Sequence, residues 1–301
     1  MEIRVLKYFM AVANEGSFTR AAERLHISQP TLSRQLHDME EMYGAQLFIR
    51  EPRHVRLTEE GLLLKRRAEE ILALVDTTEQ ELFRRNDDVS GDIAIGAGES
   101  IYFKNVLAII SDMRRSHPGI HAKVITADAE MNLYLLERGL IDFAFAYGDL
   151  DPARYEALPL PYRDQWGVFL RNDDPLTVKS ELCPDDIAGR DLVLSRQVVS
   201  DSTHGDDMKR WLGKSMGNLN ISGTYTMAYN GALMVTQGIG IMLTFLHLVD
   251  AASLGLAVRP LSPAIYAQPR IVWKRHQTFS KASQLFLEKL QENLALNQYN
   301  Q

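Results

Sequence analysis

Apolar residues recur every three or four positions along the first 44 residues, a spacing typical of amphipathic helices. The pattern predicts one helix that ends at Gly16, a short second helix capped by Ser17, and a third helix between Ser28 and Gly44. Serine is a favoured N-cap, and glycine is favoured just after a helix end. The third helix is expected to bury Leu32, Leu36, Met39 and Tyr43 on one face.

The second and third predicted helices are joined by a turn of three to four residues around His26, which is typical of a helix-turn-helix. The N-terminal half of the second helix of such a motif enters the DNA major groove. The side chains fit that role, because Arg34 can bind a guanine edge and Gln29 or Gln35 can pair with adenine. Helical cores of this kind without DNA-binding function exist, and the pattern alone leaves them as an alternative.

Basic residues follow the third helix. Leu47 and Phe48 are expected to anchor a small core, and Arg50, Arg53 and Arg56 then alternate with other residues. This spacing predicts a two-stranded wing whose basic side chains contact the phosphate backbone of DNA.

Residues 59–86 contain neither proline nor glycine apart from Gly61, which predicts one long helix. Apolar positions along it follow a heptad spacing. Such a narrow seam packs either on the chain's own domains or on a second copy. The predicted seam residues are Leu64, Ala68, Ile71, Val75 and Leu82, together with Thr78. Residues 86–91 are expected to form a hinge.

From residue 92 the pattern alternates between strands and helices, which predicts an α/β fold with a mainly parallel sheet. A second α/β unit is expected over about residues 164–262, flanked by proline-rich passages at 158–161 and 260–269. The predicted strands are 92–98, 121–127, 141–147, 165–171, 191–195, 221–226, 239–245 and 269–274, and the predicted helices include 102–116, 130–138 and 280–296.

Composition is that of a globular protein, with 46% hydrophobic and 24% charged residues. No apolar run approaches the ~20 residues of a membrane helix, and no secretory signal is expected. One cysteine, Cys183, forms no internal disulfide or zinc cluster, so a cytoplasmic location is expected. Residues 1–58 hold eight basic and seven acidic residues, so net charge alone does not indicate nucleic-acid binding.

Catalytic signatures are missing from the sequence, which contains no GxSxG, HExxH, GxxxxGKS or CxxC pattern. His204 with Asp206 and Asp207 is a weak candidate for a metal site, and residues 96–100 form only a partial glycine-rich turn. We therefore expect no enzyme activity, no metal and no cofactor.

The stretch SFTRAAERLHISQPTLSRQLHDMEEMYGAQLFIREPRHVRLTEEG, residues 17–61, resembles the winged helix-turn-helix of bacterial LysR-type transcriptional regulators. The wing departs from the usual pattern, because Glu51 and Pro52 stand where glycine is more common. The resemblance implies DNA contacts at Ser28, Gln29, Pro30, Thr31, Ser33, Arg34, Arg50 and Arg53.

Looser motifs, HPGI, ERGLIDFAFA and QGIGIMLTF, resemble the periplasmic-binding-protein-like effector domain of the same family. The resemblance therefore implies a DNA-binding domain at 1–58, a dimerisation helix and hinge at 59–90, and an effector-binding domain at 91–301. Lobe I would comprise about 91–161 and 266–301, and lobe II about 162–265.

Ligands of open α/β sheets bind beyond the carboxyl ends of strands, beside helix N-termini. Asn230 and Asp128 occupy such places, and the resemblance adds Ser100, Thr203 and Thr244 as effector contacts. A plain helix cap is the alternative at each place. Asp128 facing the cleft would disfavour a simple anionic effector and favour one that bears an amine, amide or hydroxyl.

These observations predict a sequence-specific regulator that binds double-stranded DNA as a dimer or tetramer, responds to a small-molecule effector, and acts on RNA polymerase without binding membranes. The alternative is an effector-binding solute receptor without a transcriptional role, which would need an export signal and would not carry a winged helix-turn-helix.

Overall fold

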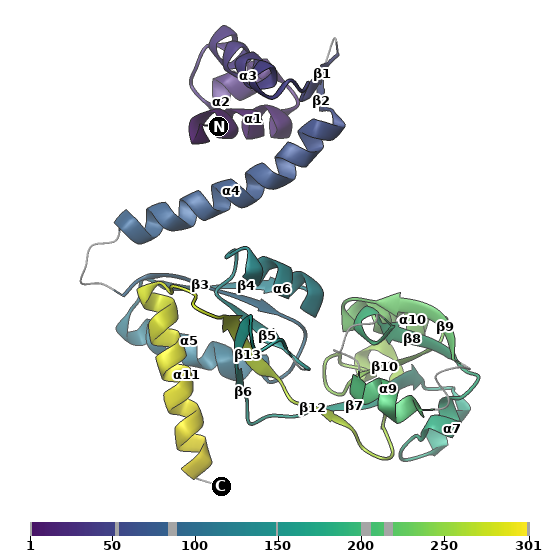
Figure 1. Cartoon of the computed structure of the whole chain (residues 1–301). Coiled ribbons are helices and arrows are strands. Elements are labelled where there is room, and N and C mark those ends of the chain that lie inside the picture. Colours follow the sequence, from purple (N-terminus) through teal and green to yellow (C-terminus); the bar gives the residue numbers. More distant parts are fainter. Residues whose placement is uncertain are drawn as a thin grey trace. The chain divides into compact units, whose positions relative to one another are not determined.

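The computed structural model describes residues 2–51, 54–83, 89–148, 150–199, 206–213 and 219–299. It contains two compact units, Met1–Arg85 and Asn86–Gln301, which are described separately below (Figure 1). Among the described residues, no helix is both long and apolar enough to cross a lipid bilayer.

The first unit is a winged helix-turn-helix followed by a long helix. Its elements are α1 (Ile3–Glu15), α2 (Phe18–Arg24), α3 (Gln29–Tyr43), the antiparallel pair β1 (Phe48–Arg50) and β2 (Val55–Leu57), and α4 (Glu59–Phe83). The predicted caps are confirmed. Ser17 accepts the amide of Arg20 and Ser28 accepts the amide of Thr31, while Gly16 and Gly44 end their helices with left-handed φ angles of 58° and 59°.

The core of this unit lies between the three helices and the wing. Leu32 and Leu36 of α3 are fully buried, and the rings of Phe9 and Phe48 lie 5.2 Å apart between centroids. The prediction that Tyr43 is buried is wrong, because it is 45% exposed. The core extends along α3 only as far as Met39, so the last turn of the helix projects into solvent.

The predicted seam on α4 needs a correction in its first half. Ala68 is fully buried in the core of its own unit, and Leu64 packs against that core. Because this stretch of α4 packs on the core of its own unit, Ala68 cannot contact a second copy, whereas Leu64 stays partly exposed. Ile71 and Leu74 are 37% and 50% exposed, and Val75 is half-buried. The side chain of Leu82 lies outside the described residues.

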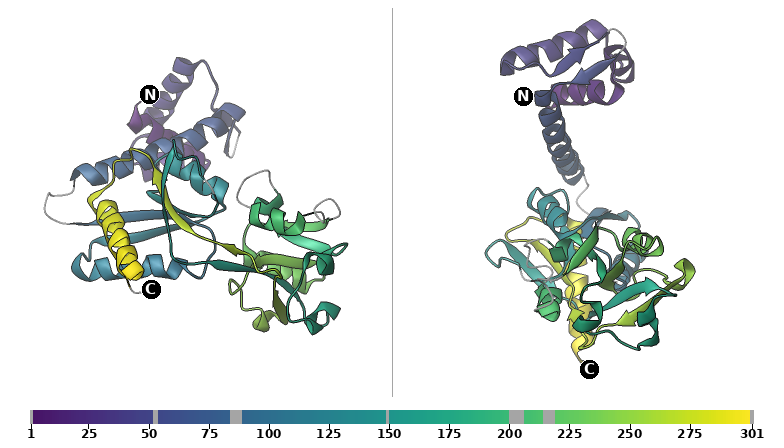
Figure 2. Two further views of the ribbon diagram at one scale, coloured as in Figure 1. Left: turned by 60° about the horizontal axis from the view of Figure 1, so that its bottom comes forward. Right: turned by 90° about the vertical axis from the view of Figure 1, so that its right-hand side faces the viewer.

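The second unit has two lobes, each a mixed sheet with helices packed against it (Figure 2). In lobe I the strand order is β4 (Ile120–Thr126), β3 (Gly91–Ala97), β5 (Phe143–Ala146), β13 (Arg270–Lys274) and β6 (Tyr155–Pro159), with helices α5 (Phe103–Ser116), α6 (Ala129–Glu137) and α11 (Lys281–Tyr299). Phe143 and Phe286 are fully buried in its core.

Lobe II has the strand order β11 (Leu256–Pro260), β7 (Asp164–Arg171), β10 (Ile241–Phe245), β8 (Asp191–Ser195) and β9 (Asn220–Tyr225), with β12 (Tyr266–Ala267) beside β7. Its helices are α7 (Pro184–Ile187), α8 (Arg196–Val199), α9 (Asp206–Leu212), α10 (Ala228–Thr236), and the short 3-10 turns Pro175–Val178 and Ala252–Leu254.

Each predicted strand is present with its ends shifted by at most two residues. The expected mainly parallel arrangement is confirmed in both lobes, with one reversed strand in each sheet that the pattern did not predict. β13 runs antiparallel to both of its neighbours and β7 runs antiparallel to β10 and β11, while the other strands of each five-strand order share one direction. Both antiparallel strands begin where the chain passes from one lobe to the other. Asp164 and Gln165, which open β7, pair with Ala267 and Tyr266 of β12, so two adjacent antiparallel segments connect the lobes.

Candidate nucleic-acid interface and ligand cavity

The N-terminus of α3 is an exposed edge of the first unit. The hydroxyl of Ser28 accepts the amide of Thr31 at 3.3 Å and lies 2.7 Å from the Thr31 hydroxyl, which fixes the start of the helix. Gln29, Pro30 and Thr31 are exposed, and Ser33 is half-buried. Because the first turn of a helix leaves amides without intrahelical partners and carries a partial positive charge, it attracts anions.

Arg34 lies one turn further along α3 and is exposed. It has no hydrogen bond or ion pair with any described residue. The neighbouring Arg24 is different, because it donates to Glu15 at 2.9 Å. The forked guanidinium of Arg34 therefore remains available for a bidentate contact with a planar acceptor edge, such as that of guanine.

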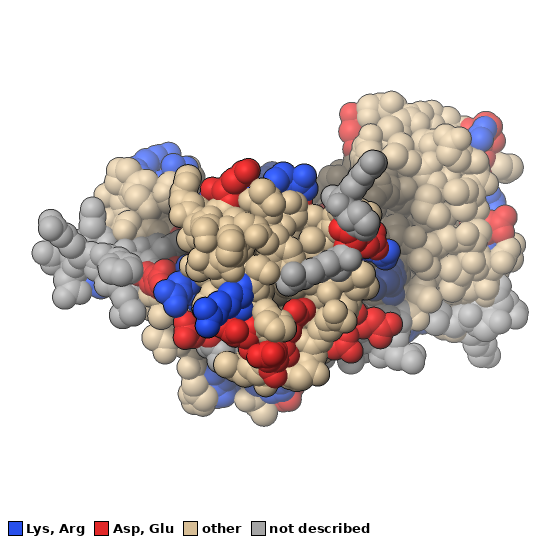
Figure 3. Space-filling model, turned by 90° about the horizontal axis from the view of Figure 1, so that it is seen from above, with Lys and Arg blue, Asp and Glu red and all other residues tan. Residues whose placement is uncertain are grey.

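Glu51 stabilises the turn of the wing through its backbone amide and its carboxylate. The amide of Glu51 donates to the carbonyl of His54 at 3.0 Å, and the Glu51 carboxylate lies 3.7 Å from Arg56 and 2.6 Å from His54. Arg53 and the side chain of Arg50 lie outside the described residues, so their predicted contacts remain predictions. Basic and acidic side chains are interspersed on the face in Figure 3.

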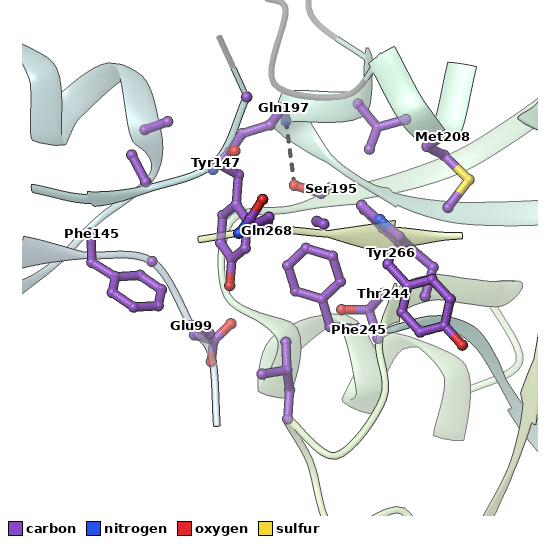
Figure 4. Close-up of a pocket in the computed structure, with 18 of the residues that line it drawn as sticks. Glu99, Phe145, Tyr147, Ser195, Gln197, Met208, Thr244, Phe245, Tyr266 and Gln268 are labelled. Atoms are coloured by element: carbon purple, nitrogen blue, oxygen red, sulfur yellow. Dashed lines mark hydrogen bonds between the residues drawn. The ribbon is translucent and has the colours of Figure 1, made fainter. Parts of the chain in front are cut away.

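A cavity of about 440 Å³ lies between the two lobes of the second unit, within the ~300–1,000 Å³ typical of small-molecule sites. Aromatic rings from both lobes form a continuous row along it (Figure 4). The ring centroids of Phe145 and Tyr147 are 5.9 Å apart, those of Tyr147 and Phe245 are 5.1 Å apart, and those of Phe245 and Trp166 are 4.5 Å apart. The cavity therefore has an aromatic row along one wall, among lining residues that also include polar and charged side chains.

Of the five predicted effector contacts, the structure brings Thr244 to the cavity wall, where its side chain is buried. Ser100 is not part of the wall, because its hydroxyl donates to Asp164 at 2.7 Å and accepts the amide of Tyr102 at 3.0 Å. Asn230 is exposed and is not a wall residue, because it lies inside α10, which begins at Ala228, two residues before Asn230. Thr203 lies outside the described residues.

Asp128 needs a correction as well. Its carboxylate caps α6 by accepting the amide of Met131 at 3.0 Å, and it pairs with Arg196 at the start of α8 in the opposite lobe. The residue is buried and is not part of the cavity wall. Because Asp128 pairs with Arg196 and does not line the cavity, the condition on which it would disfavour an anionic effector is not met.

Glu99 makes a second bridge between the lobes that the sequence patterns did not reveal. It lines the cavity from lobe I, and its carboxylate accepts the amide of Ala228, the first residue of α10 in lobe II. The residue in the N-cap position of α10, Met227, provides no side-chain bond. An acid from one lobe thus caps a helix of the other, and the partners are too distant in sequence for a local motif to show this.

A buried carboxyl group lies at the start of β7, where the chain crosses between lobes. Asp164 is 2% exposed, and its Oδ2 accepts hydrogen bonds from Tyr147 at 2.6 Å and Ser100 at 2.7 Å. Burial raises the pKa of Asp164, while the two hydrogen bonds act in the opposite direction. Burial and the nearby Asp164 carboxylate also raise the pKa of Tyr147 above its usual range.

Metal ligation finds no support among the described residues, where no three His, Cys, Asp or Glu side chains gather into a possible site. His204 lies outside those residues, as do the side chains of Asp206 and Asp207.

A winged helix-turn-helix, a long connecting helix and a two-lobed α/β domain with a cavity between its lobes define a transcription regulator that responds to a small molecule. Comparison with known families gives the same result. Residues 3–62 match the family described as bacterial regulatory helix-turn-helix protein, lysR family, and residues 86–295 match the LysR substrate binding domain. The chain belongs to the LysR family of transcriptional regulators.

Relatives match most of the chain. The uncharacterized HTH-type transcriptional regulator YnfL of Escherichia coli K12 is 28% identical over 87% of this chain and 83% of its own length. The Hca operon transcriptional activator HcaR of the same organism is 26% identical over 98% and 99%. The fold matches that of full-length CbnR complexed with its target DNA, with a TM-score of 0.72 and 18% identity over 97% of this chain and 99% of that one.

Proposed function

We propose that this LysR-type DNA-binding regulator reads its operator through the start of α3. Gln29, Thr31 and Arg34 would contact base edges, with Pro30 shaping the first turn, while Ser28, Ser33, Arg50 and Arg53 hold the helix and the wing on the phosphate backbone. In this proposal, residues 1–58 bind DNA, residues 59–90 connect and dimerise, and residues 91–301 bind the effector.

The observation that carries the DNA-reading proposal is the state of Arg34. Its guanidinium is exposed and has no bonding partner among the described residues, so it would break no bond within the protein on contacting DNA. A bidentate arginine–guanine pair contributes roughly 1–3 kcal/mol of discrimination against other bases.

The effector would bind in the cavity between the lobes and change how they close. Lobe I would comprise 91–161 and 266–301, and lobe II 162–265. The cross-lobe bonds of Asp128 with Arg196 and of Glu99 with Ala228 hold one arrangement of the lobes. A ligand shifts that arrangement only through a difference in its affinity for the two states.

Self-association would use the part of α4 that its own unit leaves exposed. Ile71 and Leu74 offer an apolar surface there, continued by Val75, and Leu82 extends the same predicted seam. A two-fold dimer places two α3 helices on two half-sites. We further propose that dimers join into tetramers, that the bound protein contacts RNA polymerase, and that it acts in the cytoplasm.

The test is selection of bound duplexes from a random DNA pool by the full-length protein, followed by footprinting of the selected site. We expect a two-fold symmetric sequence from the wild type and from Arg114→Gln, a charge change on the exposed surface of α5. Arg34→Ala should yield a sequence with one base per half-site no longer specified. Failure of the wild type to enrich any sequence would refute the proposed function.

A further inference from the structure

We propose that Glu40 is a positioning residue for DNA binding, which fixes the wing relative to the recognition helix α3. Its carboxylate binds the backbone where the wing begins, so the base contacts of α3 and the phosphate contacts of the wing are held in one frame. This inference rests on the proposed DNA contacts of α3 and the wing, and adds the residue that sets their relative position.

The first observation is the bonding of Glu40. Its Oε1 accepts the amide of Leu47 at 2.6 Å and the amide of Phe48, the first residue of β1, at 3.1 Å. Hydrogen bonds to an ionised carboxylate are roughly twice as strong as those between neutral groups. Leu47 and Phe48 are buried, and a buried amide that loses its acceptor is costly. One side chain of α3 therefore holds the entry of the wing.

The second observation is that Glu40 and the proposed reading residues share one helix. α3 runs without interruption from Gln29 to Tyr43, and its face between them is buried in the core through Leu36 and its neighbours. The proposed base contacts lie in the first turns of α3, and Glu40 lies in its last turn. Because the backbone hydrogen bonds of a helix make it one rigid element, a wing that moves relative to Glu40 also moves relative to Arg34.

The third observation is that the same stretch of backbone is held from its other side. The carbonyl of Leu47 accepts the amide of Thr58, just before α4, at 3.1 Å, and the Thr58 hydroxyl donates to the carbonyl of Gln46 at 2.7 Å. Gly61 of α4 packs so closely that a Cβ there would lie 2.2 Å from the Leu47 oxygen. Removing the Glu40 carboxylate would keep these contacts with α4 and break the two bonds to α3.

Glu41 offers a matched control. It follows Glu40 on α3, its side chain is 70% exposed, and its Oε1 lies 3.4 Å from Nε2 of His37 on the same helix. Glu40→Ala and Glu41→Ala each remove one negative charge from the same turn, so the general electrostatic effect on DNA binding is similar in both. The two variants differ because Glu40→Ala also removes the bonds to the wing.

The experiment measures the affinity of the full-length protein for its selected operator across salt concentrations, with hydroxyl-radical footprinting of the same complexes. Glu40→Ala should lower the salt slope by about one and lose the backbone protection that Arg53→Ala also loses, while the base specified by Arg34 stays specified. Glu40→Gln keeps an acceptor oxygen and should restore most of the slope and the footprint. Glu41→Ala should match the wild type in both.

A merely structural role gives a different result. Glu40→Ala would then lower the melting temperature and the active fraction, but the protein that still binds would show the wild-type slope and footprint, which overturns the proposal. The proposal also fails if Glu40→Gln is as defective as Glu40→Ala, or if Glu41→Ala reproduces the loss. Should Glu40→Ala not fold, Glu40→Asp decides, since it keeps the charge but is one methylene shorter. A reduced slope and footprint in Glu40→Asp supports the proposal, and wild-type values overturn it.

A double variant tests whether Glu40 acts through the wing. If Glu40→Ala already displaces the wing, adding Arg53→Ala should change the salt slope little further. Additive losses would show that the wing is positioned without Glu40. Failure of the proposed function is seen separately, because a wild type that selects no operator refutes that function. A wild type that selects one, with an unchanged slope and footprint in Glu40→Ala, refutes the positioning role alone.

Discussion

The start of α3 and the cavity between the lobes are both binding surfaces, but they are built in opposite ways. The α3 surface comes from seven consecutive residues, 28–34, most of them exposed and not needed for the core. The cavity is assembled from segments spread between Gly98 and Arg270, and many of its side chains are buried. Substitutions at exposed positions of this stretch such as Arg34 should therefore change recognition without changing stability, whereas substitutions around the cavity should change both.

The largest expected effect is the difference in stability between a charge placed at a buried position of α4 and the same charge placed at an exposed position. Ala68→Asp puts an unpaired charge into the core of the first unit, where Ala68 is fully buried, and should destabilise that unit by about 3 kcal/mol or more. Leu74→Asp adds the same charge at a half-exposed position. It should leave melting nearly unchanged and shift the protein toward monomers.

Circular dichroism melting and light scattering after size exclusion check this pair. Equal stability of the two variants would show that α4 does not pack on α1 as described. A Leu74→Asp protein that stays dimeric would place the interface elsewhere.

Arg34→Ala should reduce base discrimination by roughly 1–3 kcal/mol at one base pair of each half-site. Melting should stay as in the wild type, since the side chain has no described partner to lose. Competition binding with single-base variants of the operator measures the effect. A drop in melting temperature would show that Arg34 supports the fold. That result would contradict the claim that exposed positions of α3 serve recognition alone.

Arg196→Gln breaks a bridge between the lobes and should cost about 1–2 kcal/mol, because it leaves the buried Asp128 carboxylate without its cation while Arg196 itself is half-exposed. Asp128→Asn in the same chain should restore part of the loss. Thermal melting of the two single variants and the double variant gives the coupling free energy between Arg196 and Asp128. Additive losses would mean that the pair does not hold the lobes together.

The smallest expected effect concerns Asp164. Because burial raises its folded-state pKa above that of the unfolded chain, the folded state binds the extra proton. The free energy of unfolding contributed by this group falls as pH rises from the ordinary aspartate pKa through the raised one. Asp164→Asn keeps an oxygen that accepts from Ser100 and Tyr147 and should flatten this dependence. Melting from pH 3.5 to 8 checks it, and an unchanged slope would contradict the assignment.

Local features of the sequence predicted local features of the structure. Ser17, Ser28, Gly16 and Gly44 were identified as caps because a cap depends on residues within one turn. Three strands were missed, and all lie at the proline-rich passages 158–161 and 260–269, which the pattern indicated as connecting segments. β6 and β11 end at Pro159 and Pro260, and β12 lies inside the second passage.

Long-range bonds could not be predicted in this way. The bond from Glu99 to Ala228 and the buried group at Asp164 depend on how two lobes meet, and the sequence around each residue resembles an ordinary turn. Asp128 was correctly placed at a helix start, but its partner Arg196 comes from the other lobe, so its role was predicted wrongly. The seam on α4 failed at Ala68 for the same reason, because α1 competes for that face.

The most direct test of the central claim is the affinity of full-length protein for its selected operator and for every single-base variant, measured across a range of salt concentrations. The account predicts that Arg34→Ala abolishes discrimination at one position per half-site and leaves the other positions as in the wild type. By contrast, Arg53→Ala should weaken all sequences alike and reduce the salt slope by about one. A uniform loss of affinity in Arg34→Ala, with every base still specified, would contradict it.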